Sequence, residues 1–289
     1  MSVNMDPRQA YRDNGYYIFR DALATSEIRK LWDTLETEIV QSNDRFYRQK
    51  SRSLEANRYV QDSEGKQVVS NALLNPHGRT EAIRTASAIR DLICTVEVAD
   101  LLGSIDGATS YTIHQTIVFF TPPKTDMHVD GWSFDSQPRG YNHTLWIPLE
   151  RVTLLNSPIA IVPWPLGRFI PPEEFGLVDF LAKGDNGTRE DYHNYHNRLI
   201  EHVQQHRPDC VVPHLNPGDL VVFSSLTPHA TMPYRQEPPS RRAIQVLIRD
   251  SSRRWASWEQ QIREGTTNAP DEPCDRLMTV SDRWRLVMS

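Results

Sequence analysis

The sequence predicts a mainly β protein, a barrel or a sandwich of short strands with helices packed on its outside. Two observations lead to this fold class. Helical patterns dominate the N-terminal third of the 289 residues, and from Tyr111 onward short apolar runs are separated by Pro, Gly, Asn and Asp. Many short strands that follow helices are typical of barrels and sandwiches. Because single β domains with helical additions often reach this length, we expect one domain over residues 1–289.

The first predicted elements are a short strand and an amphipathic helix. Residues 15–19 are aromatic and β-branched, which favours a strand. A helix follows, because apolar residues recur at a spacing of three to four and form one face, made of Ile28, Leu31, Leu35 and Ile39. Thr25, Ser26 and Glu27 resemble a capping sequence at its start.

A second helix is predicted from Glu81 to Leu102. Its expected buried side consists of Ile83, Ile89, Leu92, Ile93 and Val96. The two helices together predict a helical support over about residues 20–105, packed against the β core.

Five apolar runs predict the strands of a core over about residues 111–250. These runs are residues 111–121, 144–152, 159–162, 220–224 and 243–249. An insertion at about residues 171–213 interrupts them, and its centre is predicted to be helical from about Arg189 to His206. A long insertion between core strands is either a functional lid or surface padding.

The composition argues against two classes of partner. A formal net charge of −5 and a pI near 6.1 favour neither nucleic acid nor a membrane, so we expect a small-molecule substrate. The first residues do not resemble a secretory signal, and no run has transmembrane length. Three cysteines without a CxxC spacing are typical of free thiols, so a cytoplasmic location is expected. The oligomeric state stays open.

Three residues form a candidate metal-binding set. His128 and Asp130 are two positions apart, so in extended backbone their side chains point the same way. His229 follows the predicted strand at 220–224, about 100 residues later. Two imidazoles and one carboxylate make the facial triad of non-haem Fe(II) oxygenases, which leaves positions open for a chelating cosubstrate and O₂.

A pair of arginines adds a candidate for the cosubstrate. The His-x-Asp spacing alone is common by chance, but here Arg241 and Arg242 also open the strand at 243–249. The planar guanidinium of arginine suits the distal carboxylate of 2-oxoglutarate. The combination predicts an oxygenase that uses Fe(II), 2-oxoglutarate and O₂.

Six short motifs resemble the phytanoyl-CoA dioxygenase (PhyH-like) family of Fe(II)/2-oxoglutarate oxygenases, over about residues 15–250. They are Asp13-Asn14-Gly15-Tyr16-Tyr17-Ile18, Phe119-Phe120-Thr121-Pro122-Pro123, His128-Val129-Asp130-Gly131-Trp132, Leu145-Trp146-Ile147-Pro148-Leu149, Asn216-Pro217-Gly218-Asp219 and Arg241-Arg242-Ala243. The resemblance implies a double-stranded β-helix, also called a jelly roll and cupin-like.

The same resemblance assigns roles to individual residues. It implies that His128, Asp130 and His229 are the catalytic iron ligands and that Arg241 binds 2-oxoglutarate, with Arg242 as the alternative. For the same cosubstrate it implies contacts from Trp146, Thr231 and Gln115.

The implied activity is the oxidation of a small-molecule metabolite, with hydroxylation as the default and succinate and CO₂ as coproducts. Desaturation, epimerisation or ring formation in natural-product biosynthesis are alternatives. So are a jelly-roll binding protein without turnover and a cupin-type dioxygenase that needs no cosubstrate. Trp164-Pro165-Leu166-Gly167 departs from the Gly-Ser-His that usually stands at this point in the family. An acyl-CoA substrate is therefore not carried over.

Substrate choice is predicted for residues around the open coordination positions. Trp132 and Phe134 follow the His-x-Asp motif, and the segment from Phe175 to Pro213 supplies Tyr192 and Tyr195 for stacking. This mixture suits a polar, ring-containing metabolite. The insertion also holds four histidines, which are interpreted as a solvated helix face, namely His193, His196, His202 and His206.

Overall fold

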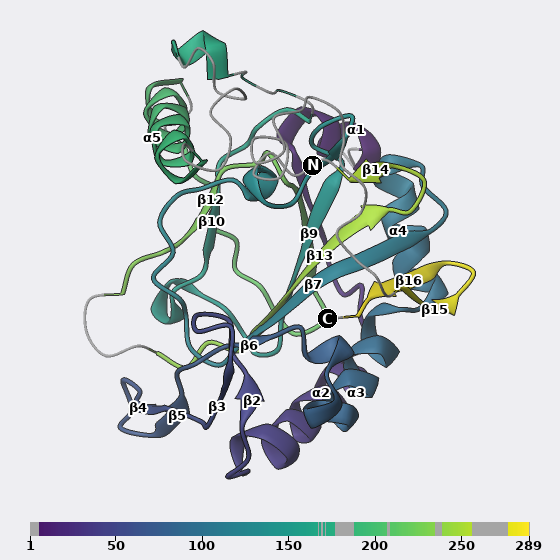
Figure 1. Cartoon of the computed structure of the whole chain (residues 1–289), viewed down its shortest axis with the longest axis vertical. Helices are drawn as coiled ribbons and strands as arrows, with labels where there is room; N and C mark the ends of the chain where they lie inside the picture. The colour runs from purple at the N-terminus through teal and green to yellow at the C-terminus, as the bar shows by residue number, and fades with distance from the viewer. Residues whose placement is uncertain are drawn as a thin grey trace, which may run out of the picture.

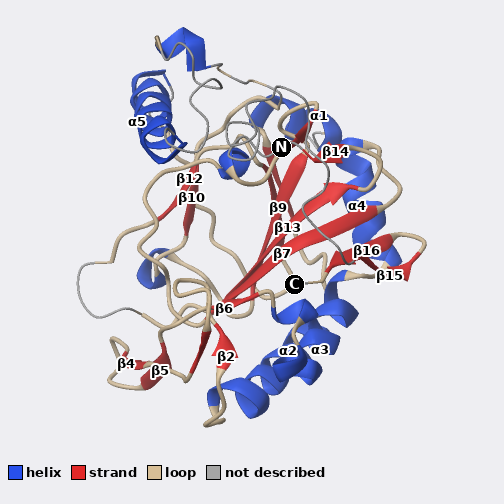
Figure 2. Cartoon of the chain, in the orientation of Figure 1, coloured by secondary structure: helices blue, strands red, loops and turns tan. Residues whose placement is uncertain are grey.

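A mixed eight-stranded sheet forms the centre of the fold (Figures 1 and 2). The computed structural model describes residues 6–166, 168, 170, 172–176, 188–206, 209–234, 239–255 and 277–288. The strands of the large sheet follow the order β1 (Tyr16–Phe19), β11 (Leu220–Ser224), β9 (Asn142–Pro148), β13 (Ala243–Asp250), β7 (Tyr111–Phe119), β16 (Trp284–Val287) and β15 (Leu277–Ser281), and β6 (Leu73–Leu74) also pairs with β7.

A smaller sheet lies apart from the large one in the view of Figure 1. It pairs β10 (Ile159–Ile161) with β12 (His229–Thr231) in antiparallel register. Isolated bridges extend it on both sides, from His229 to His128 and from Ile161 to Val211. These two sheets agree with the barrel or sandwich that the sequence predicts, and all five predicted core strands are present within a few residues of their expected bounds.

The two faces of the large sheet serve different purposes. Alternate residues of its central strands, such as Val118, Leu145 and Ile244, join a hydrophobic core with residues of the helices. The intervening residues, such as Ile117, Trp146 and Leu247, line a cavity on the opposite face. This alternation follows from the two-residue period of a strand.

The helices that cover the first face are α1 (Pro7–Asn14), α2 (Thr25–Leu35), α3 (Ile83–Ile93) and α4 (Val96–Asp106). All four predicted apolar residues of α2 and the π-helical turn after it (Glu36–Val40) are buried. The predicted cap is wrong, because Ala24 precedes the helix and no side chain caps it.

The second predicted helix is in fact two helices. They are separated at Cys94 and Thr95, where the Thr95 hydroxyl accepts the Val98 N–H and caps α4. The predicted burial of two residues is wrong. Val96 is 55% exposed because the helical period restarts there, and Ile83, at the first position of α3, is 64% exposed. The predicted burial of the other three residues, Ile89, Leu92 and Ile93, is confirmed.

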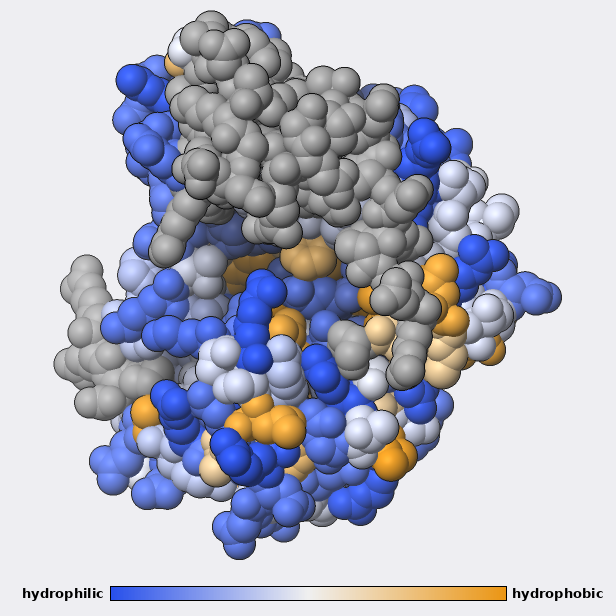
Figure 3. Space-filling model, viewed as in Figure 1, coloured by the Kyte–Doolittle hydropathy of each residue, from blue (hydrophilic) through white to orange (hydrophobic). Residues whose placement is uncertain are grey.

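The remaining elements are short or peripheral. They are β2 (Phe46–Tyr47), β3 (Leu54–Glu55), β4 (Tyr59–Gln61), β5 (Gln67–Val69), β8 (Ser136–Gln137), β14 (Arg254–Trp255) and five 3-10 turns, Pro76–Gly78, Thr80–Ala82, Asp130–Trp132, Leu154–Asn156 and Pro172–Phe175. On the face viewed in Figure 3 hydrophilic residues predominate, and hydrophobic ones are scattered. No helix among the described residues has the length and apolar character needed to cross a bilayer.

The insertion contains the predicted helix, α5 (Thr188–His206). Its Tyr195, Leu199 and Val203 are buried in a cluster with Val129 and other residues around the His-x-Asp motif. His193 is exposed, as a solvated face requires, but the ring of His202 packs edge-on against Trp164. The interpretation of a fully solvated face is therefore wrong for His202, since α5 rests on the core through that side. Much of the insertion, including the Tyr192 side chain, lies outside the described residues.

Candidate metal centre

Backbone pairing brings the two histidines of the candidate set together. His128 and His229 exchange two backbone hydrogen bonds of 2.9 Å, one in each direction. Their ring centroids are consequently 4.2 Å apart, although the residues are distant in sequence. Residues that exchange both hydrogen bonds in this way lie directly opposite each other in an antiparallel ladder, with side chains on the same face.

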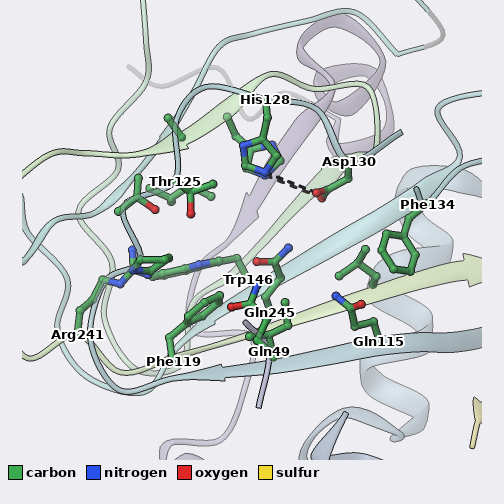
Figure 4. Close-up of a pocket in the computed structure, with 17 residues that line it drawn as sticks. Gln49, Gln115, Phe119, Thr125, His128, Asp130, Phe134, Trp146, Arg241 and Gln245 are labelled. Atoms are coloured by element: carbon green, nitrogen blue, oxygen red, sulfur yellow. Dashed lines mark ion pairs between the residues drawn. The ribbon is translucent and has the colours of Figure 1, made fainter. Parts of the chain in front are cut away.

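Asp130 completes the set from the 3-10 turn Asp130–Trp132. Its Oδ1 lies 3.8 Å from His128 Nε2, and its Oδ2 lies 3.9 Å from His229 Nε2 (Figure 4). One ligand atom from each of the three residues lies within 4.8 Å of the others. A donor set of two imidazole nitrogens and one carboxylate on one side of an open cavity fits Fe(II).

Hydrogen bonds orient each member of this set. The Nδ1 atoms of His128 and His229 lie 2.8 Å and 3.0 Å from the carbonyl oxygens of Asp126 and Thr227. An Nδ1–H that donates to a carbonyl leaves the Nε2 lone pair for a metal ion. Thr144 on β9 donates its hydroxyl to Asp130 Oδ2 at 2.7 Å.

The protonation state of His229 also suits a ligand. Burial lowers its pKa to about 4, His128 nearby lowers it further, and Asp130 opposes the shift. The imidazole is therefore neutral near pH 7, the form that coordinates metals.

The turn that carries Asp130 is tied to the strand end opposite. Gly131 donates its N–H to the Ser225 carbonyl at 2.8 Å. A Cβ at this position would lie 2.9 Å from Leu226 Cδ2 and 3.3 Å from the Ser225 oxygen. Glycine suits this position, because a larger residue would press on the Leu226 side chain and on the Ser225 carbonyl.

Arg241 lies at another part of the same cavity and is almost fully buried. One guanidinium nitrogen donates to the Ser157 carbonyl at 3.0 Å, whereas Nε has no hydrogen-bond partner among the described residues. Burial lowers the pKa of Arg241 to about 9, so it is still protonated near pH 7. A buried cation with an unused donor fits an incoming carboxylate.

Arg242 faces away from this cavity. Its Nε lies 3.6 Å from a Glu150 carboxylate oxygen, and its guanidinium stacks 3.9 Å over the Trp32 ring. It lines a separate cleft beside α2. The geometry therefore favours Arg241 over Arg242 as the partner of a cosubstrate in the main cavity.

The cavity has a volume of about 160 Å³ and includes most of the residues that the sequence singles out (Figure 4). Those found in its lining are His128, Asp130, His229, Arg241, Trp146, Thr231, Gln115 and Phe134. Trp132 is absent from the lining and packs against the cluster beneath α5. The substrate contact proposed for Trp132 stays a prediction.

Sequence reasoning missed several residues of the cavity. Gln49, Thr125 and Gln245 line it, and Thr144 supports Asp130 from behind. Only Gln245 had a local signal, since it lies four residues after Arg241, on the strand that the sequence predicts at 243–249.

Comparison with known proteins identifies the family. A profile of the phytanoyl-CoA dioxygenase (PhyH) family matches residues 11–243. The chain belongs to this family. It is therefore an Fe(II)/2-oxoglutarate-dependent oxygenase, and the donor set described above fits those cofactors. A comparison with curated protein sequences gives no match.

Solved structures share the fold of this PhyH family member at low sequence identity. The non-haem α-ketoglutarate-dependent carbocyclase SnoK from nogalamycin biosynthesis is 14% identical with a TM-score of 0.56, over 93% of each chain. The epimerase SnoN, solved with Fe³⁺, α-ketoglutarate and nogalamycin RO, is 15% identical with a TM-score of 0.58, over 98% of this chain and 97% of its own. EctD from S. alaskensis, solved with 2-oxoglutarate and 5-hydroxyectoine, is 17% identical with a TM-score of 0.53, over 88% and 80%. The predicted jelly-roll fold is confirmed.

Proposed function

We propose that this PhyH family member oxidises a small-molecule metabolite, with hydroxylation as its default outcome. In this proposal His128, Asp130 and His229 hold Fe(II), and Arg241 holds the distal carboxylate of 2-oxoglutarate. One observation carries the proposal. A convergent set of two imidazoles and a carboxylate shares one cavity with a buried arginine that has an unused donor.

When bound, Fe(II) supplies the activation of O₂ that is coupled to conversion of 2-oxoglutarate into succinate and CO₂. The protein's own side chains orient the metal ligands and the cosubstrate. The histidines present Nε2 because their Nδ1 atoms are held by carbonyl groups, and Thr144 fixes the plane of the Asp130 carboxylate. Arg241 and Thr231 supply donors to the cosubstrate, and the buried ring of Trp146 excludes water beside it.

A second outcome of the same chemistry is ring closure or epimerisation. The solved relatives SnoK and SnoN are described as a carbocyclase and an epimerase, which supports this alternative for a protein of the same fold. A non-catalytic binding protein is disfavoured, because the three ligands and Arg241 are all present in one cavity.

The decisive experiment measures succinate formed from 2-oxoglutarate with and without Fe(II) under air. Wild-type protein should form succinate only with the metal, and Asp130→Ala should form none while keeping its melting temperature within a few degrees. Asp44→Ala, which removes an exposed carboxylate, is the matched control and should behave as wild type. Full succinate formation by Asp130→Ala would overturn the ligand assignment, and none by wild type would overturn the function.

A further inference from the structure

The cavity contains few charged groups, and the proposed function uses all of them. Among its described lining residues the ionisable side chains are His128, Asp130, His229 and Arg241. Iron and 2-oxoglutarate engage these four. What is left for a substrate is a wall of apolar and uncharged polar residues.

Three glutamines dominate the polar part of that wall. Gln115 is the one half-buried residue of β7 and Gln245 the one half-buried residue of β13, whose other residues are buried, because both side chains open into the cavity. Gln49, which follows β2 in the chain, is exposed and also lines the cavity. The side-chain amides of three residues from separate parts of the chain therefore line the same cavity.

These amides are free to bind a ligand. None of the three side chains makes a hydrogen bond to any residue within the described ranges. Other polar side chains of the same sheet are engaged, for example Thr144 with Asp130 and His143 with Asp106. An amide that has no protein partner beside a cavity keeps one acceptor and two donors for a ligand.

Of the three glutamines, Gln115 lies farthest from Arg241, and Gln49 and Gln245 lie between them, near Trp146 (Figure 4). In Figure 4 Gln115 lies beside Phe134 on one side of the drawn pocket, and Arg241 lies on the other side. Gln245 is in register with Trp146 on one neighbouring strand and with Ile117 on the other, so it faces the same side of the sheet as they do.

We infer that Gln49, Gln115 and Gln245 form the substrate-recognition wall, and that the part of the substrate inside the cavity is uncharged and carries both hydrogen-bond donors and acceptors. Hydroxyl- or amide-bearing rings have this chemistry. The inference rests on the proposed function, and it assigns Gln115 to the substrate rather than to 2-oxoglutarate.

The free energy of desolvation disfavours two other classes of ligand at this wall. A carboxylate or an ammonium group would be desolvated there without an opposite charge, since the amides are neutral and the charged residues are engaged. A fatty acyl chain would leave the half-buried amides of Gln115 and Gln245 without partners, and a site built for hydrogen bonds rejects ligands that lack them. The acyl-CoA substrate in the family's name is therefore disfavoured here.

Acetamide and acetate provide a matched pair of probes, because they have the same size and differ in charge and donors. Saturation-transfer NMR would compare their binding to protein loaded with diamagnetic Zn(II) and 2-oxoglutarate, so that the metal and Arg241 are already occupied. We expect a signal from acetamide and at most a tenth of that signal from acetate. Equal signals, or no acetamide signal, would overturn the inference.

Variants locate the binding. Gln245→Met keeps the length of the side chain and removes its hydrogen bonds, and it should reduce the acetamide signal at least threefold. Gln49→Met, at an exposed position, should lower the signal without a risk to folding. Gln67→Met on β5 is the control, because Gln67 is exposed and outside the cavity, and it should match wild type. An unchanged acetamide signal in both cavity variants would refute the assignment of these glutamines to substrate recognition.

The proposed function can be judged separately in the same preparation. If Fe(II)-dependent succinate formation is intact while the probe pattern fails, only the substrate inference is wrong. If succinate formation itself is missing, the proposed function fails, whichever probe binds.

Discussion

Thr144→Val tests whether the hydrogen bond behind the metal centre positions the proposed iron ligand Asp130. Thr144 is 1% exposed and donates its hydroxyl to Asp130 Oδ2 at 2.7 Å. This contact occupies one carboxylate oxygen and turns the other, Oδ1, toward the His128 side of the cavity. Monodentate binding through one oxygen leaves the coordination positions that 2-oxoglutarate and O₂ need.

The expected size of the effect follows from the kind of bond that is lost. A hydrogen bond to a charged group contributes about 1.5–3 kcal/mol, which corresponds to roughly 10- to 150-fold in an equilibrium constant. Loss of residues that orient metal ligands typically lowers metal affinity by about 10- to 100-fold. Valine keeps the β-branched shape of threonine, so β9 should keep its packing. We therefore expect Fe(II) affinity to fall at least about tenfold.

The assay is anaerobic equilibrium dialysis of Fe(II) in the presence of 2-oxoglutarate, with the melting temperature of the metal-free protein measured in parallel. Thr144→Ser retains a hydroxyl donor and should bind Fe(II) within about threefold of wild type. Wild-type affinity in Thr144→Val would show that the hydrogen bond does not position Asp130. Equal losses in Thr144→Val and Thr144→Ser would point to packing instead.

Two further predictions concern the cosubstrate and the stability of the fold. Arg241→Met should raise KM for 2-oxoglutarate by about 30-fold or more, because truncating one partner of a buried charge pair costs about 2–5 kcal/mol. Arg242→Met should leave this KM near wild type, and the reverse pattern in steady-state assays would exchange the two roles. His77 is buried with its pKa lowered to about 4 by desolvation, so the unfolded chain gains a proton near pH 6.5 that the folded chain resists until about pH 4. Its contribution to stability is complete above pH 6.5 and falls by roughly 3 kcal/mol toward pH 4. Urea unfolding of His77→Gln should therefore show a shallower loss of stability between pH 6.5 and pH 4 than wild type, and an equal loss would contradict the role of His77.

Much of the fold was predictable because its signals are local. The strand at Leu220–Ser224 and the four apolar residues of α2 and the π-helical turn after it follow periods that a single segment displays by itself. The break between α3 and α4 was missed, because the apolar spacing continues through Cys94 and Thr95 while the backbone does not. The parallel pairing of β16 with β7 was also missed, because these two strands are more than 150 residues apart in the sequence and no local pattern links them.

The site shows the same division between local and long-range information. A spacing of two places His128 and Asp130 on one side of an extended segment, so this pair can be recognised in the sequence. The cavity position of Gln49, in the turn after β2, and the support that Thr144 on β9 gives to Asp130 depend on contacts between segments far apart in the chain. The pattern of residues within a single segment does not reveal such long-range contacts.

The register of β9 shows how the far side of the sheet affects the metal centre. Two neighbours on this strand face opposite ways: Thr144 reaches Asp130, while His143 is buried against the helices. There His143 Nδ1 lies 2.6 Å from the hydroxyl of Tyr11, and its Nε2 lies 2.9 Å from a carboxylate oxygen of Asp106. A slip of one residue would turn His143 into the cavity and remove the partner of the Tyr11 hydroxyl and of Asp106 Oδ2, at a cost of about 1–3 kcal/mol for each group. The same slip would remove Thr144 from Asp130. The buried chain from Tyr11 through His143 to Asp106 therefore favours the one register in which β9 can serve the metal centre, although none of its members lines the cavity.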